Sequence, residues 1–472
     1  MSTPLIQNKA DIFAALPPER AASLMPQIQE AVAANGDKII ILDDDPTGTQ
    51  TAHDVTVLTS WTTEIFVEAL SDPSAAVFVL TNTRSLTANK AEALNREIAI
   101  RLTEAAQRVN RGYVLISRSD STLRGHFPLE TDTLASASGQ NYDGVLVIPA
   151  FMAGGRYTID GVHYVAEGED LIPAAQTPFA QDAAFGYQSS DLRQWVAEKT
   201  GGAVSASDVH HLSLTAIRKE GVQAAQRTLS ELEDGAYCVV DAVSERDLEV
   251  VALAAIQAEA DGKCLLYRTA ASFAAVRAGV TLRPLLSADE LRTTRTGGGL
   301  VVVGSYVPKS SHQLDHLLSH TDIGEAEVNV RRLLDEQTRQ EEIARAVEKA
   351  RAQLQQDQPV VVYTSRVLIT AEDAAGSLDI GARISESLVQ ITRQLQDATR
   401  YIIAKGGITS SDLATIALEA KQAHVRGQIL PGVPVWDLGE DSAEPGLIYV
   451  VFPGNVGDVD ALTKTVGKFE AR

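Results

Sequence analysis

Apolar residues in this chain fall into short runs, separated by longer stretches in which apolar residues recur at helical spacing. From Ala88 to Asn110, for example, Ala, Leu and Ile recur at that spacing. Such alternation is typical of parallel strands connected by helices. We therefore expect an α/β protein with two domains, each a mostly parallel sheet flanked by helices.

The apolar runs that predict strands form two series. The first comprises 38–42, 54–58, 76–81, 113–117 and 144–150, and the second comprises 236–242, 264–269, 300–305, 361–365, 401–407 and 447–455. Right-handed crossovers between parallel strands make such domains doubly wound, with ligand loops at the carboxyl ends of the strands. The polar residues that follow these runs are therefore the candidates for chemistry.

A chain of 472 residues is too long for one ordinary hydrophobic core, which favours two domains. The segment RTTRTGGGL at 292–300 is the clearest boundary, because three glycines precede a new β-branched strand. We predict an N-terminal domain over 1–270, a connection over 271–299 and a C-terminal domain over 300–472. The active site is expected in the cleft between the two domains.

Composition and charge restrict the class of partner. Hydrophobic residues make up 44% and charged residues 22% of the chain, a balance typical of globular enzymes. The formal net charge of -21 opposes non-specific attraction to nucleic acid or to an anionic membrane. The N-terminus has no basic segment followed by an apolar one, and no run is apolar and long enough to span a bilayer. We predict a cytoplasmic protein without nucleic-acid or membrane partners, and a homodimer stays an open hypothesis.

The first polar loop is acidic. Asp43, Asp44 and Asp45 follow the strand 38–42 directly. Three adjacent carboxylates repel one another and are unfavourable beside an apolar strand. A metal ion, a basic neighbour or a substrate hydroxyl would compensate them, and a solvated turn with helix-capping side chains is the alternative.

Three further loops of the first series carry arginine. Arg84 lies in the loop after 76–81, Arg118 and Arg124 lie in the loop after 113–117, and Arg156 follows 144–150. If these strands are parallel neighbours, the four side chains reach one sheet edge together with the aspartates. A guanidinium suits two-pronged binding of a carboxylate. The alternative is that at least one of these arginines pairs structurally with a nearby acid.

Three loops of the second series are rich in small residues. They are 305–311, 406–412 and 453–458. Glycine permits close approach of the backbone, so N–H groups can surround phosphate oxygens. The first of these loops ends in Lys-Ser but lacks the preceding glycine, which excludes a Walker A motif. The three loops together indicate a nucleotide site.

Four histidines lie in segments that could bind a metal ion or the substrate. His312, His316 and His320 are four residues apart and would share one helix face, but no cysteine or glutamate cluster lies nearby. An exposed polar face is favoured, and no metal site is predicted. His126 follows the 119–125 segment directly, so a substrate contact and a structural role are both open.

Several motifs together resemble the four-carbon acid sugar kinase family. They are DDDPTGTQ (43–50), TNTRS (81–85), SDSTLRG (119–125), PAFMAGGR (149–156), GGITSSD (406–412), PGVPVW (431–436) and FPGN (452–455). They occur in order from about Lys38 to Asp458, nearly the whole chain. The resemblance implies that the N-terminal domain binds the sugar acid and the C-terminal domain binds ATP.

The resemblance also implies roles for residues at matching positions. Asp44 and Asp45 are the catalytic candidates, and the substrate-binding candidates are Asp43, Arg84, Arg118, Asp120, Ser121, Thr122, Arg124 and Arg156. The nucleotide-binding candidates are Ser305, Gly406, Gly407, Thr409, Gly454 and Asn455. The chain departs from the family in Arg118-Ser119 before the DST triplet, and in the third aspartate, the proline and Gln50 of the first loop. These departures leave the identity of the sugar acid open.

The expected reaction is phosphoryl transfer from ATP to a hydroxyl of a threonate-like or erythronate-like acid, or of a related oxo or branched acid. Phosphoryl transfer requires mainly positioning and charge stabilisation. The arginines would bind the carboxylate, an aspartate would act as general base, and Mg²⁺ would bridge the ATP phosphates with at most one or two carboxylates. A dehydrogenase is disfavoured because no G-x-G-x-x-G follows a strand. A sugar-acid or nucleotide sensor or effector without turnover stays the alternative.

Overall fold

The computed structural model describes residues 5–45, 48–281, 283–366, 369 and 374–471. The chain forms two compact units, one made of residues 1–48 and 60–281 and the other of residues 49–59 and 282–472. Pro46 and Thr47 of the first acidic motif lie outside the described residues. The expected domain limits at 270 and 300 stay a prediction.

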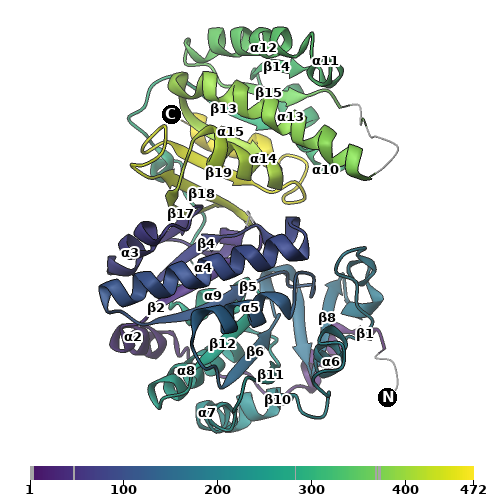
Figure 1. Cartoon of the computed structure of the whole chain (residues 1–472). Coiled ribbons are helices and arrows are strands. Elements are labelled where there is room, and N and C mark those ends of the chain that lie inside the picture. The colour runs from purple at the N-terminus through teal and green to yellow at the C-terminus, as the bar shows by residue number, and fades with distance from the viewer. Residues whose placement is uncertain (1–4, 46–47, 282, 367–368, 370–373, 472) are drawn as a thin grey trace. The chain divides into compact units, whose positions relative to one another are not determined.

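The first unit contains a parallel sheet in the strand order β10-β11-β6-β12-β5-β2-β4 (Figure 1). The strands are β2 (Lys38–Asp43), β4 (Ala76–Leu80), β5 (Tyr113–Arg118), β6 (Gly144–Ile148), β10 (His210–Leu212), β11 (Ala236–Val240) and β12 (Leu265–Thr269). Every residue of β2, β4, β5, β6 and β12 is buried, as expected for strands covered on both faces.

Helices of the first unit form two groups that flank this sheet (Figure 1). In one group α3 (Thr63–Ser71), α4 (Ala88–Val109) and α5 (Leu129–Ser138) pack in sequence, and in the other α2 (Met25–Asn35), α7 (Val222–Ser230) and α9 (Ala271–Arg277) pack against α8 (Glu245–Ala260). The shorter helices are α1 (Lys9–Ala15) and α6 (Leu192–Lys199).

A small antiparallel sheet joins the N-terminus to the middle of the first unit. Its order is β1-β9-β8-β7, made of β1 (Gln7–Asn8), β7 (Arg156–Ile159), β8 (Val162–Glu167) and β9 (Asp170–Pro173). Its core contains Tyr157, Tyr164 and Leu171. This sheet was not anticipated from the sequence.

The second unit contains a mixed sheet in the order β3-β17-β18-β19-β16-β13-β15-β14. The parallel strands are β13 (Gly298–Val303), β14 (Gly324–Val328), β15 (Val360–Thr364), β16 (Thr399–Lys405) and β19 (Ile448–Phe452), and the antiparallel ones are β3 (Val55–Leu58), β17 (Gln422–Leu430) and β18 (Val433–Leu438). Its helices are α10 (Pro308–His320), α11 (Val330–Leu334), α12 (Arg339–Leu354), α13 (Ala374–Leu395), α14 (Gly407–Asp412) and α15 (Ala461–Glu470).

The α/β class with mostly parallel, helix-flanked sheets is confirmed. Each of the eleven apolar runs named from the sequence overlaps a strand. The run at 54–58 is a strand of the second unit, however, because β3 pairs with β17 and Trp436 Nε1 donates to Thr49 Oγ1 at 3.1 Å. Among the described residues, no helix is both long enough and apolar enough to cross a membrane.

Candidate functional site

The first aspartate of the acidic loop is committed to a structural ion pair. Asp43 ends β2, and Arg118 ends the neighbouring strand β5 at the register-matched position. Arg118 Nη1 donates to Asp43 Oδ1 at 2.8 Å, and both side chains are buried. A β-carbon on Gly48 would lie 1.6 Å from Asp43 Oδ2, so only glycine lets the loop backbone cover this carboxylate. Burial raises the pKa of Asp43, and Arg118 opposes that shift.

Asp44 is buried too, but one of its oxygens is uncommitted. Ser119 Oγ donates to Asp44 Oδ2, whereas Oδ1 accepts no hydrogen bond from the described residues and lies 3.8 Å from Arg84 Nη1. A buried carboxylate oxygen without a partner is unfavourable, and such atoms are concentrated at functional sites. Asp43 Oδ2 is likewise buried without a hydrogen-bond partner among the described residues, but it lies against Gly48, whereas Asp44 Oδ1 lies beside Arg84.

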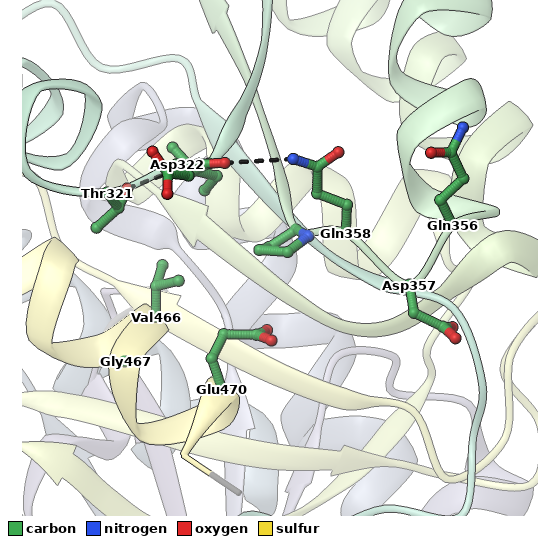
Figure 2. A pocket seen from close by; sticks show the side chains of 10 residues that line it. Thr321, Asp322, Gln356, Asp357, Gln358, Val466, Gly467 and Glu470 are labelled. Atoms are coloured by element: carbon green, nitrogen blue, oxygen red, sulfur yellow. Dashed lines mark hydrogen bonds between the residues drawn. The ribbon is translucent and has the colours of Figure 1, made fainter.

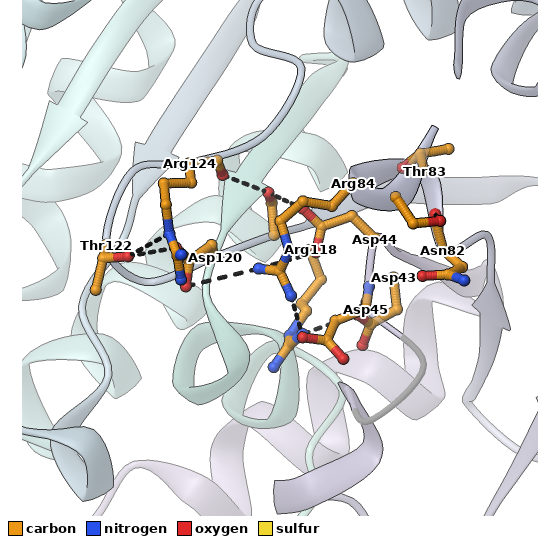
Figure 3. Close-up of polar contacts among 12 residues, drawn as sticks. Asp43, Asp44, Asp45, Asn82, Thr83, Arg84, Arg118, Asp120, Thr122 and Arg124 are labelled. Carbon is orange, nitrogen blue, oxygen red and sulfur yellow. Dashed lines mark hydrogen bonds and ion pairs between the residues drawn. The ribbon is translucent and has the colours of Figure 1, made fainter. Parts of the chain in front are cut away.

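Arg84 links three of the acids (Figure 3). Its guanidinium contacts Asp45 directly and lies 3.6 Å from Asp120 Oδ1, besides the contact to Asp44. Burial would lower the pKa of Arg84, but Asp44 and Asp45 raise it, so the guanidinium is firmly charged. Arg84 is held in place by the short turn Thr83–Ser85, whose backbone oxygen at Thr83 accepts from His126 Nε2 at 3.1 Å.

The loop after β5 forms a second group of contacts. Arg124 Nε donates to Asp120 Oδ2 at 2.6 Å and to Thr122 Oγ1 at 3.1 Å, and Thr122 also donates to Asp120 (Figure 3). Burial would raise the pKa of Asp120, but Arg84 and then Arg124 lower it. The guanidinium of Arg124 also lies 5.1 Å from the ring centroid of Phe179.

Arg156 does not form an ion pair with the acids among the described residues. It donates instead to the backbone oxygen of Gly154, and its guanidinium lies 5.8 Å from the Phe179 ring centroid. Arg124 and Arg156 thus share one aromatic neighbour. Of the four arginines that were expected to meet the acids, Arg84, Arg118 and Arg124 do so. Arg118 is the arginine that forms the expected structural pair with a nearby acid.

Two buried charges at this edge were missed from the sequence. Arg268 at the end of β12 donates to the backbone oxygen of Arg124 at 3.2 Å, and Glu130 at the start of α5 accepts from Thr83. Burial, together with the nearby Asp44 charge, raises the pKa of Glu130 to about 7. The available signal for Arg268 was its position near the end of the apolar run 264–269. Nothing in the sequence of that segment, however, indicates that β12 lies between β5 and β6.

The backbone of the 119–125 loop accepts a hydrogen bond from a buried histidine. His163 Nε2 donates to the backbone oxygen of Ser121 at 2.8 Å, and His163 Nδ1 accepts from Thr158 at 3.0 Å. Burial lowers the pKa of His163 to about 4, so the ring is neutral at physiological pH. His126, for which a substrate contact had been left open, donates to the backbone oxygens of Thr83 and Leu86 and so has a structural role.

In the second unit, the three small-residue loops follow adjacent strands. The strands β13, β16 and β19 lie next to one another in the sheet. Ser305 follows the carboxyl end of β13, Gly406 that of β16 and Gly454 that of β19. A β-carbon on Gly406, which has φ 123°, would lie 3.0 Å from Ser305 Cβ, and one on Gly454 would lie 3.1 Å from Ser305 Oγ. These loops therefore pack closely through glycine, and Asn455 follows in the same turn.

Gly407 differs from its neighbours in the space around it. Outside its own helix and chain neighbours, no described residue has an atom within 4 Å of the position that a β-carbon would occupy at Gly407, although Thr409 two residues on is buried. The exposed side of this loop is thus open to a ligand. Open space beside glycine backbone is what phosphate oxygens require.

Two other features of the second unit lie apart from these loops. A hollow of about 540 Å³, shown in Figure 2, is lined by residues that include Asp322, Asp357 and Glu470. It lies before the amino ends of β14 and β15, at the edge opposite to the small-residue loops. On α10, the His316 and His320 rings stack at 3.9 Å, and the described part of the chain contains no group of three metal-ligating side chains.

Comparison with known proteins finds two family models that together match most of the chain. Residues 39–277 match a model described as a sugar-binding N-terminal domain, and residues 300–462 match a nucleotide-binding C-terminal domain. A D-threonate kinase of Salmonella typhimurium is 27% identical over 84% of this chain and 90% of its own length, and one of Cupriavidus necator is 28% identical over 71% and 74%.

Solved structures share the fold. A Salmonella typhimurium protein aligns with a TM-score of 0.66 and 20% identity over 90% of this chain and 98% of its own length. A Haemophilus influenzae protein aligns with a TM-score of 0.65 and 18% identity over 91% of this chain and 100% of its own length. Together, the two matched domains and the motifs within them show that the chain belongs to the four-carbon acid sugar kinase family.

Proposed function

We propose that this protein is an ATP-dependent kinase that phosphorylates a hydroxyl of a four-carbon sugar acid, with D-threonate as the first candidate. The observation that carries the proposal is the conjunction of two D-threonate kinases aligned over most of the chain with a buried acid and arginine cluster in the sugar-binding domain. The departures in the first loop keep erythronate and related acids as candidates.

The substrate carboxylate is assigned to Arg84 and Arg124. Both are partly exposed, at 21% and 29% of their side-chain surface, whereas Arg118 is nearly covered and neutralised by Asp43. A carboxylate arriving beside them can form charge-assisted, two-pronged contacts. Asp120, Ser121 and Thr122 lie on the same loop and supply polar contacts to the substrate hydroxyls. Arg156 completes the wall beside Phe179.

Asp44 is assigned as the general base. A base must offer an acceptor atom to the attacking hydroxyl, and Asp44 Oδ1 accepts no hydrogen bond from any described residue. Asp45 is held by Arg84, and Asp43 by Arg118. Ser119 and Arg84 on either side of Asp44 would orient its carboxylate.

ATP is assigned to the loops that carry Ser305, Gly406, Gly407, Thr409, Gly454 and Asn455. Their glycines bring the backbone close, and the space beside Gly407 is open. Mg²⁺ is proposed as the ion that accompanies ATP. Because no group of three ligating side chains occurs among the described residues, the chain fits an ion held chiefly by phosphate oxygens and water. When bound, the ion would offset charge on the transferred phosphoryl group.

The γ-phosphate must reach the acceptor hydroxyl, so we propose that the active site forms between the two domains during turnover. Closure of that kind excludes water, which would otherwise accept the phosphoryl group. The division into a sugar-acid domain over 1–270 and a nucleotide domain over 300–472 is part of this proposal. A homodimer would show in light scattering as a mass near twice 50.4 kDa.

The test is ADP release with ATP and Mg²⁺ in the presence of D-threonate, L-threonate, D-erythronate, L-erythronate and related four- and five-carbon acids. We expect one of the four-carbon acids to be the preferred acceptor and chelation of divalent ions to stop turnover. Binding of both ligands without ADP release would support a sensor instead. No response to any acid would refute the proposed substrate class.

A further inference from the structure

A lysine lies fully buried beneath the small-residue loops of the second unit. Lys405 is the last residue of β16 and is 0% exposed. Its Nζ donates to the backbone oxygen of Pro453 at 2.7 Å and to that of Gly454 at 3.4 Å, and it lies 4.0 Å from the centroid of the Phe452 ring. No carboxylate in the described ranges forms an ion pair with it.

A buried ammonium without a counter-charge is unfavourable. Burial, followed by the charge of Lys309 on α10, lowers the pKa of Lys405 to about 7. Packing alone would be served better by an apolar side chain of similar length. The lysine at this position therefore calls for an explanation beyond packing.

The backbone that Lys405 contacts supplies an explanation for this lysine. In a trans peptide, the carbonyl oxygen and the following N–H point in opposite directions. The only cis peptide of the described residues precedes Pro128, so the peptides that join Pro453, Gly454 and Asn455 are trans. Lys405 draws the oxygens of Pro453 and Gly454 inward, and Ser310 Oγ also donates to the Gly454 oxygen at 3.1 Å. The N–H groups of Gly454 and Asn455 must then point away from Lys405.

These two N–H groups have no acceptor within the described part of the chain. They are consecutive, and a pair of neighbouring N–H groups aimed the same way makes an anion-binding concavity. The turn also contacts the other loops of the unit, because Gly406 N donates to the Phe452 oxygen at 2.8 Å. The pair thus belongs to the surface assigned to ATP.

We infer that Lys405 is a positioning residue of the nucleotide site, which holds two carbonyls inward so that the N–H groups of Gly454 and Asn455 face the ATP phosphates. This inference rests on the proposed function. Lys405 does not itself contact ATP, but its charge lies directly behind the groups that do. A polyanion bound there favours the charged ammonium, so nucleotide binding near pH 8 takes up a proton at Lys405.

The test compares Lys405→Met with Lys38→Met. Lys38 is 1% exposed, begins β2 in the first unit and also donates to backbone oxygens, those of Asp72 at 3.2 Å and Ser74 at 2.7 Å. It is therefore a buried lysine of the other unit with comparable backbone contacts, although it also lies 3.5 Å from Asp72 Oδ1. ADP affinity is measured by calorimetry in two buffers of different ionisation enthalpy at pH 8, after circular dichroism and melting have verified folding.

We expect Lys405→Met to weaken ADP binding at least tenfold and to abolish proton uptake, with sugar-acid binding unchanged. Lys38→Met should lower the melting temperature but leave ADP affinity and proton uptake as in the wild type. If Lys405→Met does not fold, Ser310→Ala serves instead, since it removes one donor to the Gly454 oxygen and keeps the charge. Ser310→Ala should weaken ADP binding several-fold with proton uptake retained.

The inference would be overturned if folded Lys405→Met bound ADP as tightly as the wild type. The same holds for Ser310→Ala if Lys405→Met does not fold, and in both cases the proposed kinase function stays intact. Equal proton uptake in the wild type and Lys405→Met would also overturn it. Conversely, nucleotide binding that depends on Lys405 without phosphorylation of any sugar acid would support the inference and contradict the proposed function.

Discussion

Ser119 donates a hydrogen bond to one carboxylate oxygen of Asp44, and the other oxygen of Asp44 accepts no hydrogen bond from the part of the chain that the structure describes. Asp43 also has one oxygen without a hydrogen bond there, but its carboxylate is paired with Arg118 and covered by the loop at Gly48. This difference predicts that Asp44 matters most for turnover among the three aspartates.

Asp44→Asn should lower kcat by roughly two to four powers of ten, the usual effect of losing a general base. Asp43→Asn should act mainly on stability, because it breaks a buried ion pair. Turnover is measured by ADP release, and ATP binding is followed separately and should be nearly unchanged in both. Near-normal kcat in Asp44→Asn would remove the proposed base.

Gly125→Ala should disrupt the 119–125 loop. At Gly125, with φ 123°, a β-carbon would lie 2.7 Å from Ser119 Oγ and 3.1 Å from Asp44 Oδ2. Gly139→Ala is the matched control, because Gly139 also has positive φ, at 69°, but no atom within 4 Å. Both should lose about 1 to 3 kcal/mol of stability from the backbone conformation. Only Gly125→Ala should also lose activity. Equal kcat/KM in the two variants would mean that activity does not require the close packing of Gly125 against Ser119 and Asp44.

Gly407→Val should weaken ATP binding without unfolding the protein. The first carbon of the added side chain meets no atom of the other described elements within 4 Å, so the side chain would extend into the space assigned to phosphate. Gly467→Val, in α15 and equally unobstructed, is the control for loss of helical glycine. Calorimetry should show weaker ATP binding for Gly407→Val alone, with sugar-acid binding intact. The reverse pattern would mean that the ligands are assigned to the wrong domains.

Arg124→Ala should lower kcat/KM for the sugar acid by an amount equivalent to about 2 to 5 kcal/mol of transition-state stabilisation, because the carboxylate loses a charged partner. Arg124→Lys should restore only part of this, since an ammonium lacks the two-pronged geometry. The uncharged amide of the same acid should be a poor substrate that barely responds to Arg124→Ala. Equal damage with acid and amide would instead indicate that Arg124 acts by holding Asp120 and the loop.

The stability of the first unit should depend on pH through His163. Its pKa is about 4 in the fold and 6.5 ordinarily, so the unfolded chain binds a proton in this window while the folded protein does not. The contribution of His163 to stability must therefore fall as pH drops from 6.5 towards 4, whereas Asp43 and Glu130, whose pKa values are raised in the fold, contribute with the opposite sign. His163→Gln has no such proton, so its stability deficit relative to the wild type should shrink over this range. Urea unfolding at pH 7, 6 and 5 measures it, and a deficit that stays constant over this range would contradict the proposed titration of His163.

The local features of both units could be predicted from the sequence. The apolar run at 38–42 had to be a buried strand, and the polar residues after it had to lie at its end, because side-chain periodicity and burial are local properties. The same reasoning found the loops at 118–125, 406–412 and 453–458. The motif resemblance to the sugar acid kinase family is confirmed by matches that span both domains.

Tertiary structure alone decided which loops meet and which charges pair. Strand order placed β12 between β5 and β6, so Arg268 lies behind the 119–125 loop and Arg156 is one strand further away than expected. Strand pairing likewise assigned residues 49–59 to the second unit. Partners such as Arg118 and Asp43 follow from register between segments that lie 75 residues apart. Non-local burial and hydrogen bonding select these pairings, and neither leaves a trace in the pattern of a single segment.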